Sequence, residues 1–200
     1  MAINNFKAAL IGGGVRPNQF RVILTFPNWV PLGAAAVVKS GFLVTAASLP
    51  PSTISTTSVM YRGRNIPYAG ERQFAPWSVN VLNDTDFVIR NALEAWQQGI
   101  NSNTDNKGRV AANQYQVNAV VQQLDRNDNI LKQYEMIDIY PSNVGEIALD
   151  FNNNDVIESF PVVFEYTYWT SNVTSQTGAL GLAAGTGFSN ILGNLPTTGI

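Results

Sequence analysis

An asparagine-rich acidic segment in the last third of the chain, LDFNNNDVIESF at residues 149–160, places side-chain oxygens at alternate positions, as a calcium loop does. Such a loop needs a glycine at its sixth position and a bidentate glutamate at its twelfth. Counted from Asp150, these positions hold Asp155 and Pro161, and strand-like sequence flanks the segment. Asn and Asp tolerate the left-handed backbone of tight turns. We therefore interpret the segment as a turn between two strands.

The residue types that perform most covalent and metal chemistry are missing from this sequence. It has no Cys, which excludes disulfides and thiolate sites, and no His, which removes the commonest general base and metal ligand. None of the lysines, at 7, 39, 107 and 132, lies in a motif for a Ser–Lys pair. The 14 acidic residues could supply a glycosidase-type carboxylate pair, but nothing marks two of them as converging. We expect no enzymatic activity, no metal and no cofactor.

The composition indicates one domain whose surface is unusually poor in charge. Apolar residues make up 45% of the 200 residues, and charged residues only 13%, about half the usual share. This shortage favours a surface partly covered by other protein. The net charge of −2 argues against a dedicated nucleic-acid binder. The sequence has neither a signal-peptide pattern nor an apolar run of membrane-spanning length, so we expect it to be made in the cytoplasm.

Most of the middle of the chain alternates apolar and polar residues with period two, which predicts β-strands. The expected strands are residues 19–26, 41–47, 77–82, 115–124, 130–140, 146–151 and 156–169. Turn residues at 125–129 predict a hairpin between the fourth and fifth of these strands.

One segment, residues 84–99, has helical spacing instead. Asp84 or Thr85 can cap its first turn, and Gly99 suits the position after its last turn. The pattern predicts one amphipathic helix at about residues 85–98, packed on the β-scaffold through Leu93 and Trp96.

The last predicted strand has two contrasting faces. Its aromatic face is interpreted as core rather than as a base-stacking platform, and comprises Phe160, Val162, Phe164, Tyr166 and Tyr168. Its other face carries small residues and Glu165, and the preceding strand shows Glu146, Ala148 and Asp150 on a similar outer face. Such a face repels the phosphates of nucleic acid.

Charge is divided unevenly along the chain. Residues 1–72 carry seven basic residues and one acid, and residues 133–200 carry seven acids and no base. The basic and the acidic residues either offset each other within one fold or meet between subunits. In the second case their complementary electrostatic fields would fix the register of one subunit on the next. A head-to-tail contact of that kind makes a ring if it closes and a filament if it does not.

The two ends of the chain differ from its middle. The glycines at 12–14 are expected to form a hinge in an N-terminal arm, residues 1–14. Residues 170–200 contain six glycines and no charged residue. This C-terminal arm is either a loose terminus or a segment that orders against a neighbouring subunit.

Four motifs give the chain a family resemblance. The stretches VRPNQFRV (15–22), AASLPPS (46–52), YAGERQFAPWSVNVLND (68–84) and YPSNVGEIALDF (140–151), with the late Tyr-Thr-Tyr-Trp, resemble the tail tube protein of contractile-tailed bacteriophages. The motifs occur in the family's order, and the resemblance covers about residues 15–169. The C-terminal arm is a departure from the family pattern.

The resemblance implies a mainly β fold, an antiparallel β-sandwich or barrel with one flanking α-helix and a long protruding loop. It also implies a structural protein of the virion that forms stacked hexameric rings inside a contractile sheath, with baseplate and terminator proteins as further partners. Tape measure protein and DNA would pass through the lumen without specific binding, and no membrane is involved. The alternative is the inner tube of a tailocin or of a secretion-type contractile injection system, which delivers protein cargo.

The resemblance also suggests where subunits meet. The protruding loop corresponds to about residues 50–71, and the expected inter-subunit contacts are Met60, Tyr61, Arg62, Arg64, Tyr68, Glu71 and Arg72. Solvated charges on a free loop are the alternative explanation for this basic stretch. Glu146, Asp150 and Glu165 are expected on a surface that faces the lumen or another subunit.

Overall fold

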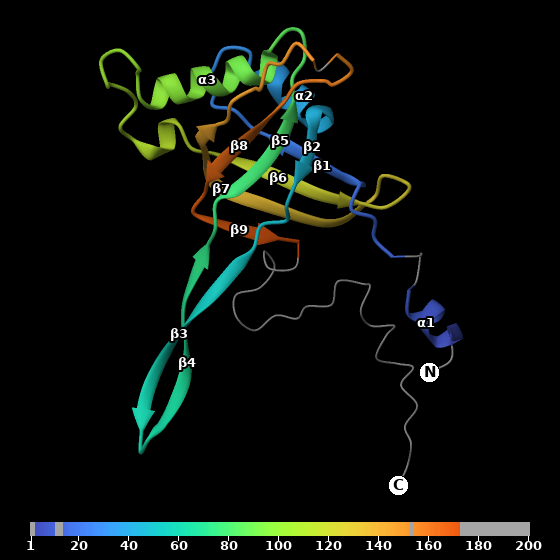
Figure 1. Ribbon diagram of the computed structural model, residues 1–200. Coiled ribbons are helices and arrows are strands. Elements are labelled where there is room, and N and C mark those ends of the chain that lie inside the picture. Colours follow the sequence, from blue (N-terminus) through green and yellow to red (C-terminus); the bar gives the residue numbers. More distant parts are fainter. Residues whose placement is uncertain (1–2, 11–13, 153, 173–200) are drawn as a thin grey trace.

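The computed structural model describes residues 3–10, 14–152 and 154–172 (Figure 1). In that part of the chain the elements follow the order α1 (Ile3–Ala9), β1 (Phe20–Leu24), α2 (Gly33–Leu43), β2 (Val44–Ala47), β3 (Ser52–Tyr61), β4 (Arg64–Phe74), β5 (Trp77–Leu82), α3 (Val88–Ile100), a 3-10 turn (Ala112–Gln114), β6 (Val117–Leu124), β7 (Ile130–Val144), β8 (Ser159–Glu165) and β9 (Tyr168–Ser171). No helix among these residues is long and apolar enough to cross a membrane.

A seven-stranded antiparallel sheet forms the body and folds over on itself along β7. The strand order is β1-β6-β7-β8-β5-β2, and β9 also pairs with β7. The first part of β7 pairs with β6 and β9, whereas its last part, from Tyr140 to Val144, pairs with β8. Between these parts lies Asp138, with φ of 60° at a register shift, and bulges of this kind bend a strand. The predicted mainly β fold, an antiparallel sandwich or barrel, is confirmed.

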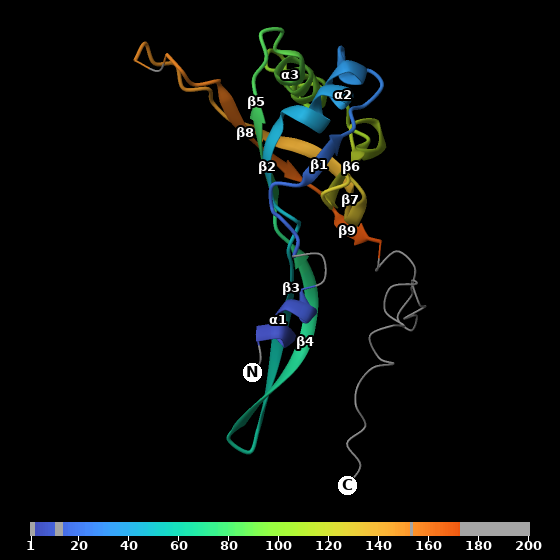
Figure 2. The same cartoon turned by 90° about the vertical axis from the view of Figure 1, so that its right-hand side faces the viewer.

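The core lies inside this folded sheet and is built by the predicted alternation. Val22 and Leu24 of β1, the apolar face of β5, and Phe160, Val162 and Phe164 of β8 are buried. The rest of the predicted aromatic face lies beyond β8, where Tyr168 is 43% exposed on β9, so the assignment of Tyr168 to the core is wrong. Helices α2 and α3 lie side by side across one end of the sandwich (Figures 1 and 2). From α3, Trp96 is fully buried against Phe26, with ring centroids 5.5 Å apart. The predicted packing through Leu93 and Trp96 is confirmed.

A helix, α2, occupies part of a predicted strand. Residues 41–43 form the last turn of α2, and β2 begins only at Val44. The run of alanines before them favours a helix. Ser40, fully buried, fixes that helix to β1, because its Oγ accepts a hydrogen bond from Leu24 N at 3.1 Å and donates one to Val37 O at 2.8 Å. The single flanking helix expected from the resemblance is therefore accompanied by a second one.

One predicted strand is absent, another is divided, and both ends of the predicted helix at residues 85–98 are displaced, since α3 runs from Val88 to Ile100. Residues 146–151 form a loop, and the predicted strand 156–169 is divided into β8 and β9, because Thr167 N turns to donate to Ile137 O at 3.0 Å. Gly99 does not follow α3 but lies within it. A Cβ at that position would collide with the Trp29 ring, so the glycine permits close packing.

The strands β3 and β4 form a separate two-stranded ribbon that points away from the sandwich in both views (Figures 1 and 2). This ribbon is the predicted protruding loop. At the N-terminus, Gly14 has φ of +80°, while the rest of the predicted hinge lies outside the described residues. The C-terminal arm beyond Asn172 also lies outside them.

Candidate assembly surface

The β3–β4 hairpin turns at two residues with left-handed backbone. Tyr61 pairs with Arg64 across the turn, and Arg62 and Gly63 between them have φ of 47° and 81°. Two positive φ values are the pattern of a type I′ turn, whose twist matches that of the strands. Gly63 suits this conformation, whereas arginine is an unusual choice for the first position.

A bulge on β4 shapes the ribbon nearer its base. The register shifts between the pairs Ile54–Arg72 and Thr56–Ala69, so that Gly70 and Glu71 together oppose Ser55. A Cβ on Gly70 would collide with the Ser55 hydroxyl and lie 3.0 Å from its carbonyl oxygen. Glycine is therefore needed here for a close backbone approach, and the bulge adds twist to the ribbon.

The base of the hairpin is fixed to the sandwich by side chains from the body. Trp77 Nε1 donates to Ser48 O at 2.8 Å, and Trp169 Nε1 donates to Pro51 O at 3.2 Å. The Phe74 ring contacts Tyr166 and Trp169, with centroids 6.1 and 6.3 Å away. The ribbon is thus held at one end by the body and extends from it.

The distal half of the hairpin exposes one apolar face. The cross-strand pairs Thr57–Tyr68, Val59–Ile66 and Tyr61–Arg64 share that face. Val59, Tyr61 and Tyr68 are each more than half exposed. No other described strand pairs with β3 or β4, so both backbone edges are open to a partner.

The structure brings all seven predicted contact residues together on this hairpin, where each is exposed: Met60, Tyr61, Arg62, Arg64, Tyr68, Glu71 and Arg72. The Arg62 guanidinium lies over the Tyr61 ring, 5.3 Å from its centroid. Arg72 Nη1 donates to Ser52 Oγ at 3.0 Å. Within the described part of the chain, neither Arg62 nor Arg64 forms an ion pair. Contact of these residues with another subunit stays a prediction.

The predicted acidic residues do not form one cluster. Glu165 is at the end of β8, opposite Tyr140, whereas Glu146 and Asp150 lie in the connection between β7 and β8. Asp150 Oδ1 accepts a hydrogen bond from Asn152 N at 2.9 Å and another from Asn152 Nδ2 at 3.0 Å. The predicted turn is confirmed, but it lies within the long loop between β7 and β8 and is not itself a tight connection between strands.

This β7–β8 loop, residues 145–152 and 154–158, has fixed ends and an exposed middle. At its start, Gly145 N donates to Pro161 O at 2.7 Å, and Arg90 Nη1 donates to Gly145 O at 2.6 Å. At its end, Asn83 Nδ2 donates to Glu158 Oε2 at 3.0 Å. These bonds hold the loop where it leaves and rejoins the sheet.

The exposed middle of the loop is the feature that sequence reasoning missed. Four large apolar side chains are strongly exposed there: Leu149, Phe151, Val156 and Ile157. The alternation of Ile147, Leu149 and Phe151 suggested a strand with a buried face, yet Phe151 is fully exposed. The polar run after Phe151 indicates a turn, but the alternation before it conceals that the loop already begins at residue 145.

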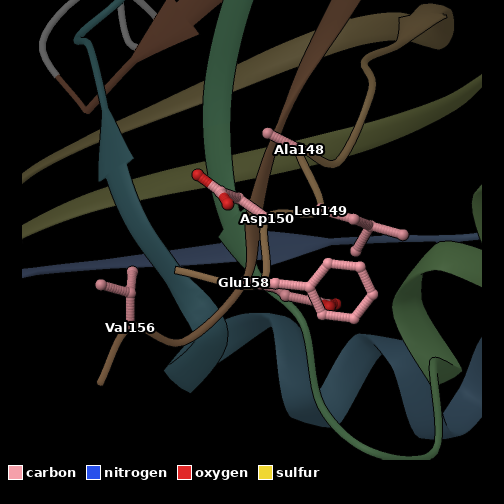
Figure 3. A pocket seen from close by; sticks show the side chains of 6 residues that line it. Ala148, Leu149, Asp150, Val156 and Glu158 are labelled. Carbon is pink, nitrogen blue, oxygen red and sulfur yellow. The ribbon is translucent and has the colours of Figure 1, made fainter. Parts of the chain in front are cut away.

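The two limbs of this loop enclose a shallow pocket of about 380 Å³ (Figure 3). Its lining mixes apolar and acidic side chains, and comprises Ala148, Leu149, Asp150, Phe151, Val156 and Glu158. The arrangement can accept a group with both apolar and positively charged parts.

Comparison with known proteins places this architecture in context. A family profile described as phage tail tube protein matches residues 15–172. The tail tube protein of Serratia phage KSP90 is 28% identical over 166 residues, which cover 82% of this chain and 93% of that protein. Tail tube protein gp19 of Enterobacteria phage T4 is 31% identical over 161 residues, which cover 79% of this chain and 92% of that protein.

Solved structures of contractile injection systems share the fold. A chain from the sheath/tube terminator of the extracellular contractile injection system PVC aligns with a TM-score of 0.57 at 11% identity, covering 79% of this chain and 96% of that one. A chain from the baseplate of the anti-feeding prophage aligns with a TM-score of 0.55 at 11% identity, covering 79% of this chain and 95% of that one.

Proposed function

The chain belongs to the phage tail tube protein family, and from that membership we propose that it is the structural protomer of a phage tail tube. It self-assembles into stacked hexameric rings inside a contractile sheath and forms the conduit for genome ejection. It is a structural protein and not an enzyme. We assign the tube domain to residues 15–169, between the N-terminal and C-terminal arms.

The observation that carries this proposal is the β3–β4 hairpin. A two-stranded ribbon with an open apolar face and two unpaired edges is an aggregation hazard in a free monomer. In a tube, neighbouring subunits cover that face and satisfy the edges. The small share of charged residues in the chain supports the same conclusion, because part of the surface is then buried between subunits.

The partners of the tube follow from this assignment. A sheath, a baseplate and a terminator protein contact the assembled tube, and tape measure protein and DNA pass through its lumen without specific binding. Glu146, Asp150 and Glu165 face the lumen or another subunit, where acids repel DNA or meet basic side chains. The protein is a component of the virion and assembles in the host cytoplasm.

The inner tube of a tailocin or secretion-type injection system is the second candidate. The structures similar in fold come from such systems, but at 11% identity they support only the fold. The relatives at 28% and 31% identity are phage tail tube proteins, which favours the phage assignment. DNA in purified particles would separate the two, since an injection system carries protein cargo instead.

Electron microscopy of the purified protein tests the proposal. We expect rings or long hollow tubes from the unmodified chain, and a folded monomer without tubes from the Arg62→Glu/Arg64→Glu double variant. The matched control, Lys107→Glu/Arg126→Glu, reverses two exposed charges elsewhere and should leave tubes intact. A wild-type monomer that persists at high concentration would refute the tube assignment. Full-length tubes from the double variant would refute the charge contact alone.

A further inference from the structure

The hairpin tip and the β7–β8 loop lie at opposite ends of the molecule. In both views the tip is the lowest part of the coloured chain, and the loop lies at the level of α3 near the top (Figures 1 and 2). The ten residues of β3 span about 33 Å at strand spacing, so the tip reaches well beyond the body. Two surfaces at opposite ends of one subunit can meet only between different copies.

The two surfaces have opposite charge. The β7–β8 loop carries the acids Glu146, Asp150, Asp155 and Glu158 and no basic residue. The tip carries Arg62 and Arg64, whose charges have no ion-pair partner within the described part of the chain. Complementary fields of this kind steer association and fix its register.

The two surfaces also match in their apolar groups. Tyr61, which is 58% exposed, presents an aromatic ring with the Arg62 guanidinium over it. The pocket of the loop combines Leu149, Phe151 and Val156 with the carboxylates of Asp150 and Glu158. An aromatic ring with an adjacent cation therefore finds both an apolar wall and a counter-charge at the same place.

We propose that the hairpin tip of one copy seats in the β7–β8 pocket of a second copy. Tyr61 packs on the apolar lining, and Arg62 and Arg64 face the acids of the loop. The contact is heterologous, because two different surfaces of the chain meet, and repetition of it produces an open stack. This inference rests on the proposed function, and it identifies which surface of the next subunit receives the hairpin.

A second uncovered apolar surface, on α2, does not suit the tip. Val38 and Phe42 are 67% and 81% exposed there. The charged side chain beside them is Lys39, and it is paired with Asp84 and Asp86. The α2 surface therefore offers an apolar contact but no free acid for two arginines.

A charge exchange tests the pairing. The loop reversal Asp150→Arg/Asp155→Arg should abolish tubes as the tip reversal Arg62→Asp/Arg64→Asp does. The fourfold variant that combines both reversals should recover at least a tenth of the wild-type tube yield. The control Asp105→Arg, which reverses an exposed acid in another loop, should assemble normally. Circular dichroism of each variant establishes that the subunit is folded.

Crosslinking supplies a readout that does not depend on charge. The chain has no cysteine, so any disulfide in a designed variant is the intended one. Assembled Asn65→Cys/Asn152→Cys protein should give a ladder of covalent multimers under oxidation, at least tenfold more than Asn65→Cys/Gln98→Cys, which replaces an exposed residue of α3 instead.

The outcomes separate this contact from the function on which it rests. Tubes of normal length from the loop reversal, or no ladder from wild-type-like tubes, would overturn the pairing and leave the tube assignment intact. Failure of the fourfold variant to assemble, although folded, would also overturn it. A wild-type chain that makes no tubes would overturn the tube assignment and this contact with it.

Discussion

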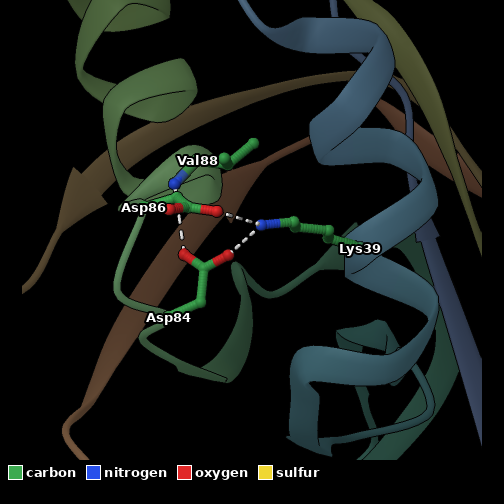
Figure 4. Close-up of polar contacts among 4 residues, drawn as sticks. All are labelled: Lys39, Asp84, Asp86 and Val88. Atoms are coloured by element: carbon green, nitrogen blue, oxygen red, sulfur yellow. Dashed lines mark hydrogen bonds and ion pairs between the residues drawn. The ribbon is translucent and has the colours of Figure 1, made fainter.

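The carboxylate of Asp84 forms an ion pair with the ammonium group of Lys39, and so links the segment that precedes α3 to α2 (Figure 4). The same carboxylate accepts a hydrogen bond from Val88 N at 3.2 Å. That N–H is one of those a helix leaves without an internal partner at its start. One side chain thus satisfies an N–H at the start of α3 and connects the two helices that cover the end of the sandwich.

Protonation of Asp84 should destabilise the fold in acid. Its pKa is lowered chiefly by the hydrogen bond from Lys39, so its contribution is present above the ordinary value of 3.8 and is lost as the pH falls through the lower folded value. The pKa of Lys39 is raised by the same bond, so its contribution is lost as the pH rises through a value above 10.5. Urea unfolding across both pH ranges measures the free energy of unfolding. We call its fall at low pH the acid limb and its fall at high pH the alkaline limb.

Three variants distinguish the ion pair with Lys39 from the hydrogen bond to Val88 N. Asp84→Asn keeps an acceptor for Val88 N but should lose the acid limb and weaken the alkaline limb, because the pKa of Lys39 is raised chiefly by Asp84. Lys39→Met should flatten both limbs. Asp84→Ala also removes the hydrogen bond to Val88 N, which should cost about a further 1 kcal/mol, the net value of one hydrogen bond. An acid limb that persists unchanged in Asp84→Asn would assign the pH dependence to other carboxylates.

The sequence anticipated the parts of this fold that depend on local pattern. The alternation at residues 77–82 predicted β5 exactly as observed, and the spacing of Leu93 and Trp96 predicted the buried face of α3. The errors arise where tertiary contacts override the pattern. Gly99 lies within α3, where the absence of a Cβ leaves room for the Trp29 ring, and no local signal shows that contact.

The candidate site was predicted only in part, for a similar reason. The hairpin residues came from the family resemblance, and the basic charge of Arg62 and Arg64 suggested an acidic partner. In the loop that we propose as that partner, the sequence predicts a strand at residues 146–151 and a turn after it, because Leu149 and Phe151 continue an alternating pattern. Their exposure depends on where β7 ends and β8 begins, and that pairing joins residues far apart in the sequence.

The buried indole of Trp96 should be sensitive to loss of one hydrogen bond. Its Nε1 donates to Tyr115 O at 2.8 Å, and the side chain is fully buried. Trp96→Phe leaves the Tyr115 carbonyl without this donor and should lower the free energy of unfolding by about 1–3 kcal/mol. Trp96→Ala also leaves a cavity and should cost about 3–5 kcal/mol. Equal losses for both variants, measured by urea unfolding, would contradict this division between hydrogen bond and packing.

Replacing Tyr166 by Phe should leave the subunit as stable or more stable. The Tyr166 hydroxyl is buried and has no hydrogen-bond partner in the described part of the chain, and burial raises its pKa above 10.0. Removing an unsatisfied buried hydroxyl avoids a desolvation cost of about 1–3 kcal/mol. Thermal unfolding measures the change, and Tyr115→Phe is a suitable comparison. A marked loss of stability in Tyr166→Phe would show that the hydroxyl has a partner.

Asparagine at position 62 should separate the folding role of the hairpin turn from its role in assembly. Arg62 has φ of 47°, and asparagine before glycine is the preferred sequence for a type I′ turn. Arg62→Asn should therefore fold at least as stably as the wild type. The same change removes a positive charge and the cation that lies over Tyr61, so tube growth should slow several-fold.

Light scattering during assembly, at several salt concentrations, measures both effects. The wild type should assemble more slowly as salt screens the tip, and Arg62→Asn should depend less on salt. Arg62→Lys keeps the charge but loses the planar group that stacks on Tyr61, so its rate should fall between the two. If Arg62→Asn grew tubes as fast as the wild type, with the same salt dependence, then Arg62 would have no part in the contact and Arg64 would have to provide the charge alone.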